Sequence, residues 1–286
     1  MKKKKHISLS TGVIYVILSA WALTTIYPIF WIILNSFKNR NEIVSNSFVL
    51  PTGDLFTLSN YKQAFERIGI LGAYRNSIVI SGIVAVAVVL FAGMASFALV
   101  RYHFKLKNVM MTAVLAGMMF PVFATIIPVF AMEASWGIVN TSSLWLSLVS
   151  VILPLIAGNL SFAIVILTGY MKGLPIELEE AAFMEGCGPF RIFFQVIVPL
   201  TKPSFATVMI FSFLWSYNDL FTQSFFLRTP KQYSITALLN MITAQQGTNY
   251  GLMAATVTLI VVPVIIVYIF LQKYIIKGMT AGAVKG

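Results

Sequence analysis

Charged residues are scarce in this chain of 286 residues. Asp, Glu, Lys and Arg together make up 10% of the sequence, whereas hydrophobic residues make up 58%. A soluble domain has about 25% charged and about 45–50% apolar residues, and the mean hydropathy here is +0.87. This composition excludes a disordered chain, argues against a soluble globule and indicates an integral membrane protein.

Cysteine and histidine are also rare. Cys187 is the only cysteine, so the chain cannot form an internal disulfide. His6 and His103 are the only histidines, and each lies near basic residues. Because no group of these residues has the spacing of metal ligands, the sequence predicts no metal site.

Long apolar runs dominate the rest of the chain. A helix needs about 20 mostly apolar residues to cross about 30 Å of hydrocarbon, and six stretches reach this length. The predicted spans are residues 11–37, 75–100, 109–132, 143–171, 204–227 and 252–276. We therefore predict an all-α integral membrane protein, in which residues 1–286 form a single transmembrane domain with six helices.

Lysine and arginine gather on one side of the predicted spans. Lys2–Lys5 precede the first span, and the loops on that side hold most of the other basic residues. Cytoplasmic loops carry such an excess, so we expect both termini in the cytoplasm. The first apolar run continues to Phe37, which is too long for a signal peptide, and an uncleaved first helix is therefore predicted.

The first outer loop, residues 38–74, is long for a connection. It contains a turn around Gly53, and a short helix over residues 60–66 is expected to be capped by Ser59 or Asn60. The loop either docks a protein outside the membrane or lies on the membrane surface, and the sequence favours neither alternative.

The inner loop between the fourth and fifth spans, residues 172–203, has a helical pattern of its own. Carboxylates from Glu177 onward complement the dipole at a helix start, and Gly186 suits a left-handed helix end. Pro189 can begin a second helix that Pro199 stops. Because the first helix has little apolar area and several small Ala residues, it fits a protein partner better than lipid.

Polar residues also occur inside two spans. The fifth contains Trp215, Tyr217, Asn218 and Asp219, and the fourth contains Asn159. Polar groups in membranes usually face a cavity or a partner, so these five are candidates for a substrate path. For Asp219, which lies toward the outer interface, a structural role is equally favoured; for Asn159, a hydrogen bond to another helix is favoured over substrate contact.

The inner loop also carries a recognisable spacing. It has Glu-Ala-Ala at residues 180–182, Gly186 after three residues, and Val-Ile-Val-Pro at 196–199 after nine more. This resembles the EAA loop of permease subunits in bacterial ABC importers, in which the last four residues are Ile, any residue, Leu and Pro; the two valines are mild departures. Residues 50–61, 211–221 and 278–286 are similar to the maltose-permease G-type subunit family of carbohydrate importers.

The resemblance implies a type I ABC importer permease fold and a set of partners. These are a second homologous permease, two cytoplasmic ATPases and an extracytoplasmic solute-binding protein, in the bacterial cytoplasmic membrane. It assigns the ATPase contact to Glu180, Ala181, Ala182, Gly186 and Pro199, and places the tail, residues 277–286, near the ATPases. The sequence has no Gly-rich phosphate loop, so we expect a non-catalytic chain without a cofactor of its own, with ATP and Mg on the partner ATPases.

Three other classes of membrane protein compete with this interpretation. A secondary transporter would usually show related halves and a midplane ion site, and an intramembrane enzyme would need a catalytic constellation; the sequence shows neither. A passive channel agrees with the hydropathy but leaves the EAA loop without a role. The resemblance favours a sugar, in particular an oligosaccharide, as the solute, and a non-sugar solute remains the alternative.

Overall fold

The computed structural model describes residues 9–66, 69–245 and 249–283. Throughout these residues every regular element is a helix, which confirms the predicted all-α class. The chain divides into two compact units, which are described separately. The first unit comprises residues 1–68 and 241–264, and the second comprises residues 69–240 and 265–286.

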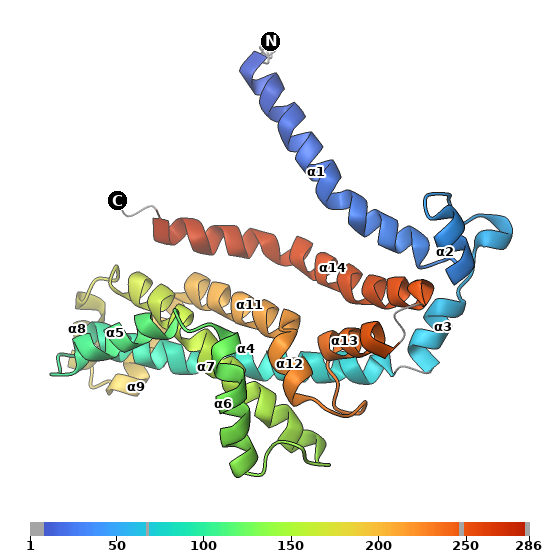
Figure 1. Ribbon diagram of the computed structural model, residues 1–286. Coiled ribbons are helices and arrows are strands. Elements are labelled where there is room, and N and C mark those ends of the chain that lie inside the picture. Colours follow the sequence, from blue (N-terminus) through green and yellow to red (C-terminus); the bar gives the residue numbers. More distant parts are fainter. Residues whose placement is uncertain (1–8, 67–68, 246–248, 284–286) are drawn as a thin grey trace. The chain divides into compact units, whose positions relative to one another are not determined.

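The first unit contains the N-terminal helices and the beginning of the last helix. Its elements are α1 (Leu9–Asn35), α2 (Arg40–Asn46), the 3-10 turn η1 (Gly53–Leu55), α3 (Ser59–Glu66) and the first part of α14 (Tyr250–Ala283) (Figure 1). Helix α3 confirms the short helix predicted in the first outer loop. Most of that loop is therefore built of short helices and does not form an extended connection.

Side-chain hydrogen bonds hold the segment after α1. Lys38 is fully buried, and its Nζ donates to two backbone carbonyls at the end of α2, at 2.8 and 3.2 Å. Burial lowers the pKa of Lys38, and the nearby Glu42 partly opposes this shift. Asn60 on α3 donates to the carbonyls of Ser36 and Lys38, both at 2.9 Å. A buried cation needs such acceptors, so the bonds give this short segment a defined fold.

The second unit contains most of the helices. Its elements are α4 (Ile70–Arg101), α5 (Lys107–Gly117), α6 (Val122–Ser135), α7 (Leu144–Met171), α8 (Glu177–Met184), α9 (Pro189–Ile192), the π turn η2 (Phe193–Ile197), α10 (Val198–Leu200), α11 (Lys202–Asn218), α12 (Phe221–Phe226), the start of α13 (Ile235–Gln245) and the end of α14.

Helices α4, α7 and α11 pack against one another and form the core of the second unit (Figure 1). Val88, Leu167 and Val208, one from each helix, are fully buried in this core. At the contact between α4 and α11, Gly93 leaves room for the ring of Phe205, because a Cβ added there would lie 2.8 Å from that ring. The tight crossing agrees with the small residues found where membrane helices meet.

Four helices in the described part of the chain are long and apolar enough to cross a membrane. They are α1 over Ser10–Asn35, α4, α7, and α14 over Tyr250–Phe270. Two bent pairs, α5 with α6 and Pro189–Leu200 with α11, bring the number to six if each pair counts as one span. The six predicted spans therefore all have a helical counterpart.

The third predicted span, residues 109–132, corresponds to a bent pair of helices and not to one continuous helix. Helix α5 ends at Gly117, α6 begins at Val122, and the two are bent by 105°. Pro121 disfavours a helical conformation at Phe120 and has no N–H to continue the ladder. The break therefore follows from one proline.

The fifth predicted span, residues 204–227, is also broken. Helix α11 ends at Asn218, the backbone of Asp219 is extended with a ψ of 114°, and α12 starts at Phe221. The polar residues that mark this part of the sequence lie at the break. The polar stretch thus ends α11 before the predicted span is complete.

The inner loop follows the predicted helix–glycine–helix order. Helix α8 is followed by Gly186 with a φ of +83°, which confirms the left-handed residue expected there. The second helical run starts at Pro189 as predicted and ends at Leu200, one residue beyond the expected stop at Pro199. A π turn precedes Pro199, and turns of this kind are frequent at functional sites.

Candidate solute pathway and coupling helix

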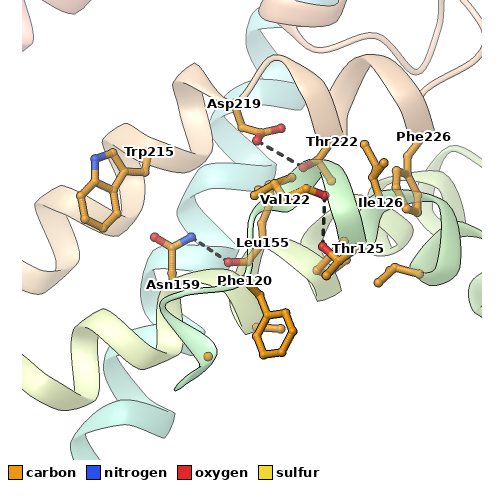
Figure 2. A pocket seen from close by; sticks show the side chains of 15 residues that line it. Phe120, Val122, Thr125, Ile126, Leu155, Asn159, Trp215, Asp219, Thr222 and Phe226 are labelled. Carbon is orange, nitrogen blue, oxygen red and sulfur yellow. Dashed lines mark hydrogen bonds between the residues drawn. The ribbon is translucent and has the colours of Figure 1, made fainter. Parts of the chain in front are cut away.

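A cavity of about 460 Å³ lies in the second unit (Figure 2). Helices α6, α7, α11 and α12 and the break between α5 and α6 contribute its walls. The lining residues are Gly117, Phe120, Val122, Thr125, Ile126, Val129, Pro154, Leu155, Ala157, Gly158, Asn159, Trp215, Asp219, Thr222 and Phe226. A mostly apolar wall with a few polar groups is typical of a small-molecule site.

Asn159 contributes an amide to this cavity from α7. The side chain is 7% exposed, and its Nδ2 donates to the carbonyl of Leu155 in the same helix at 2.7 Å (Figure 2). Its Oδ1 has no hydrogen-bond partner among the described residues. The hydrogen bond from Nδ2 is thus within its own helix, and the amide oxygen is buried without a partner in the described part of the chain.

Three aromatic side chains line the cavity, and two of them, Trp215 and Phe120, are well exposed. Trp215 on α11 is 46% exposed, and its ring packs edge-on against Phe162 at a centroid distance of 4.7 Å. Phe120, at the break between α5 and α6, is 68% exposed. Aromatic rings offer large apolar faces that lose little side-chain entropy on binding, so both can contact a bound solute.

Asp219 lines the cavity at the break in the fifth span. Its carboxylate accepts hydrogen bonds from the Thr222 hydroxyl at 3.2 Å (Figure 2) and from the Gln223 backbone N–H at 3.1 Å. These bonds satisfy free donors in the first turn of α12. The backbone carbonyl of Asp219 accepts from the Thr236 hydroxyl at 3.0 Å. Asp219 therefore shapes the turn and also presents its carboxylate at the cavity.

The other two predicted path residues lie elsewhere. Tyr217 is buried and stacks on Phe213 at 6.0 Å, and it does not line the cavity. Asn218 is exposed, and its Nδ2 donates to the carbonyl of Leu214 at 2.8 Å. Helical geometry explains the difference, since neighbouring residues point to different faces of a helix.

Several cavity residues were missed in the sequence. Phe120, Thr125 and Thr222 line the cavity, yet none has a charge or a motif that marks it. The hydroxyl of Thr125 donates to the carbonyl of Val122 at 3.1 Å, which is a bond that many helical threonines make. Pro121 gave one signal in the sequence, because a proline favours a kink within a helix. That the kink forms a wall of the cavity became visible only in three dimensions.

Helix α8 presents two different faces. Glu180 and Ala181 are exposed, whereas Ala182 is half-buried and packs against the core of the second unit. Phe183 and Met184 are 68% and 85% exposed at the end of the helix. The outward face thus combines carboxylates with large apolar side chains, which is a surface suited to another protein.

Residues 89–281 match the family described as "Binding-protein-dependent transport system inner membrane component". The chain belongs to this family. The permease is also 33% identical to the galactooligosaccharides transport system permease protein GanQ of Bacillus subtilis, with 100% of this chain and 99% of that protein covered. It is 32% identical to the arabinooligosaccharides transport system permease protein AraQ of Halalkalibacterium halodurans, with 93% of each covered.

A solved structure supports the fold of the permease. A chain in the crystal structure of a bacterial ABC transporter involved in the import of the acidic polysaccharide alginate matches with a TM-score of 0.77. The match covers 95% of this chain and 99% of that chain at 22% identity, so it shows the fold alone. The permease is therefore a multi-pass inner membrane component of a bacterial ABC transporter that works with ATPase and binding-protein partners.

Proposed function

We propose that this permease forms half of a membrane path for an oligosaccharide, and that a second homologous permease forms the other half. The cavity between α6, α7, α11 and α12 carries this proposal. It offers aromatic faces from Trp215 and Phe120 and the amide group of Asn159, and no Lys or Arg side chain is among its lining residues. Such a lining suits a neutral, hydroxyl-rich solute, in agreement with the oligosaccharides named for the two relatives.

The exposed face of α8 supports the second part of the proposal. Two cytoplasmic ATPases dock on the two permeases, bind ATP with Mg, and draw α8 with them when they close. Glu180, Ala181, Gly186 and Pro199, all exposed, belong to this contact, and Ala182 supports it from the packed side. To move the permease almost completely between two states, the ATP-bound partners must favour one state by about 5.5 kcal/mol.

The outer loop and the orientation complete the proposal. An extracytoplasmic binding protein delivers the solute, and residues 38–66 with α2, η1 and α3 provide a folded surface for it on the outer side. Both termini then lie in the cytoplasm. With Cys187→Ser as background, Asp54→Cys should react with an impermeant thiol reagent in intact cells, and Lys172→Cys should not. Labelling of Lys172→Cys would reverse the orientation.

Reconstitution tests the transport role directly. The permease, its partner permease, the ATPases and the binding protein are placed in liposomes, and uptake of labelled galacto- or arabinooligosaccharides is measured with and without ATP. We expect uptake that depends on both ATP and the binding protein. ATP-independent uptake driven by an ion gradient would indicate a secondary transporter, and uptake restricted to peptides or ions would reject an oligosaccharide as the solute.

A further inference from the structure

Arg101 and Glu179 form an ion pair between two helices. Arg101 lies in the last turn of α4, and its Nε donates to Oε1 of Glu179 in the first turn of α8 at 2.6 Å. Its Nη2 also donates to the backbone carbonyl of Leu174, at 3.2 Å, just before α8. One guanidinium thus holds both the helix and the segment that leads into it.

The burial of this pair sets it apart from an ordinary surface contact. The two side chains are 12% and 10% exposed. The other ion pair within the described residues, Lys62 with Glu66, spans 4.0 Å within one helix, and both of its side chains are largely exposed. Exposed pairs contribute little, whereas removing one partner of a buried pair leaves an uncompensated charge. The link between α4 and α8 is therefore a strong one.

Helix α8 has few other means of attachment. Its inward face carries Glu179 and the small Ala182, and its remaining side chains are exposed. Since Ala182 buries little apolar area, the charged pair is the main specific contact that sets the position of α8.

The opposite end of α4 is also tied to a neighbouring segment. Asn76 in the second turn of α4 donates to the carbonyls of Lys231 and Tyr233, both at 3.0 Å. The hydroxyl of Ser77 accepts from the backbone N–H of Ile235 at 2.8 Å. Helix α4 therefore links α8 at one end to the segment before α13 at the other, across 32 residues.

We propose that Arg101 is a positioning residue that transmits the movement of α8 to α4 during the transport cycle. The proposal rests on the proposed docking of an ATPase on α8. When the ATPase displaces α8, Glu179 and the Leu174 carbonyl move with it. Because both are hydrogen-bonded to the guanidinium of Arg101, they draw the end of α4 along. Apolar contacts could slide, whereas two directed hydrogen bonds from one planar group resist a change of angle.

The experiment uses the complete transporter in liposomes and measures solute uptake per ATP hydrolysed. In Arg101→Gln and Glu179→Gln we expect the ATPases to stay bound and hydrolysis to continue, while uptake per ATP falls roughly fivefold or more. The double variant Arg101→Gln/Glu179→Gln should be no worse than either single variant, because the two residues act as one unit. Lys105→Gln, which removes a nearby exposed charge, should leave the ratio unchanged.

Rescue separates positioning from folding. Arg101→Glu should uncouple uptake, and Arg101→Glu/Glu179→Arg should restore much of the ratio. Normal uptake per ATP in both single Gln variants would overturn the proposal. The proposal would also be overturned if Arg101→Gln lost the ATPases and the exchanged pair, Arg101→Glu/Glu179→Arg, did not recover them. Arg101 would then serve only to fold the loop. Failure of the docking role itself gives a different result, namely full ATPase retention when the outward residue Ala181 is replaced by Arg.

Discussion

Trp215 on α11 and Asn159 on α7 line one cavity from two different helices. The indole is half exposed, and the amide oxygen has no hydrogen-bond partner among the described residues. The exposed indole offers an apolar face to a sugar ring, and the Asn159 amide adds a polar group to the same wall. Trp215 and Asn159 are thus two specific candidates for contact with the solute, and substitutions can test this role.

Removing the indole should weaken transport without harming assembly. Trp215→Ala should lower ATP-driven uptake about tenfold, which corresponds to about 1.4 kcal/mol, while Trp215→Phe should keep most of it because an aromatic face remains. Asn218→Ala is the matched control, since Asn218 is exposed on the same helix and does not line the cavity. Equal uptake in Trp215→Ala and Asn218→Ala would assign Trp215 to packing.

Asp219 should contribute to stability through the turn before α12. Asp219→Ala removes the acceptor for Thr222 and Gln223, and should cost about 1 kcal/mol of stability, as for other helix caps. Asp219→Asn keeps an acceptor oxygen and should unfold close to the wild-type temperature. Thermal unfolding of the purified complex in detergent measures both variants. An unchanged midpoint in Asp219→Ala would show that the turn does not depend on these bonds.

The sequence predicted the helical class, the number of spans and the order of the inner loop. These follow from hydropathy, from the glycine at residue 186 and from the proline at residue 189, which act over short distances. The size of the bend near Pro121 and the end of α11 before Asp219 could not be predicted, because an apolar run of sufficient length looks like a complete span. Whether it bends depends on which partners the freed backbone groups find in the folded chain.

The candidate site was predicted only in part, because its residues come together only in the folded chain. Polar residues within spans drew attention to the fifth helix, but the sequence could not show which of Trp215, Tyr217 and Asn218 face the cavity once the helix ends. Arg101 was read only as a cytoplasmic charge, and Glu179 only as a partner of the helix dipole. Their pairing joins residues far apart in the chain, and no local pattern records it.

The crossing of α4 and α11 should be sensitive to added volume. Gly93→Ala places a Cβ 2.8 Å from the ring of Phe205 and should cost about 1–3 kcal/mol, as overpacking does. Gly82→Ala on the same helix meets nothing within 4 Å and should be neutral or slightly stabilising. Thermal unfolding of the complexes with Gly93→Ala and with Gly82→Ala gives the two midpoint temperatures to compare. Equal midpoints would mean that the ring of Phe205 moves aside without a cost in stability.

The left-handed glycine after α8 should be replaceable only by a residue that accepts its backbone conformation. Gly186→Val should cost about 1–3 kcal/mol, because a β-branched residue resists a φ of +83°. Gly186→Asn should be tolerated, since Asn visits this region readily; the surroundings offer room for either side chain. ATP-driven uptake by both variants at equal expression is the measurement. Full uptake in Gly186→Val would show that the end of α8 need not be held.

The central claim is that the exposed face of α8 docks an ATPase, and Ala181 tests it most directly. Ala181→Arg adds a bulky cation to that face without disturbing the core, whereas Lys172→Arg preserves the charge at an exposed position at the start of the loop. Each complex is purified through a tag on the permease, and the ratio of ATPase to permease is measured. The account predicts a loss of ATPase of about tenfold or more in Ala181→Arg and a wild-type ratio in Lys172→Arg. A wild-type ratio with normal ATP-driven uptake in Ala181→Arg would contradict it.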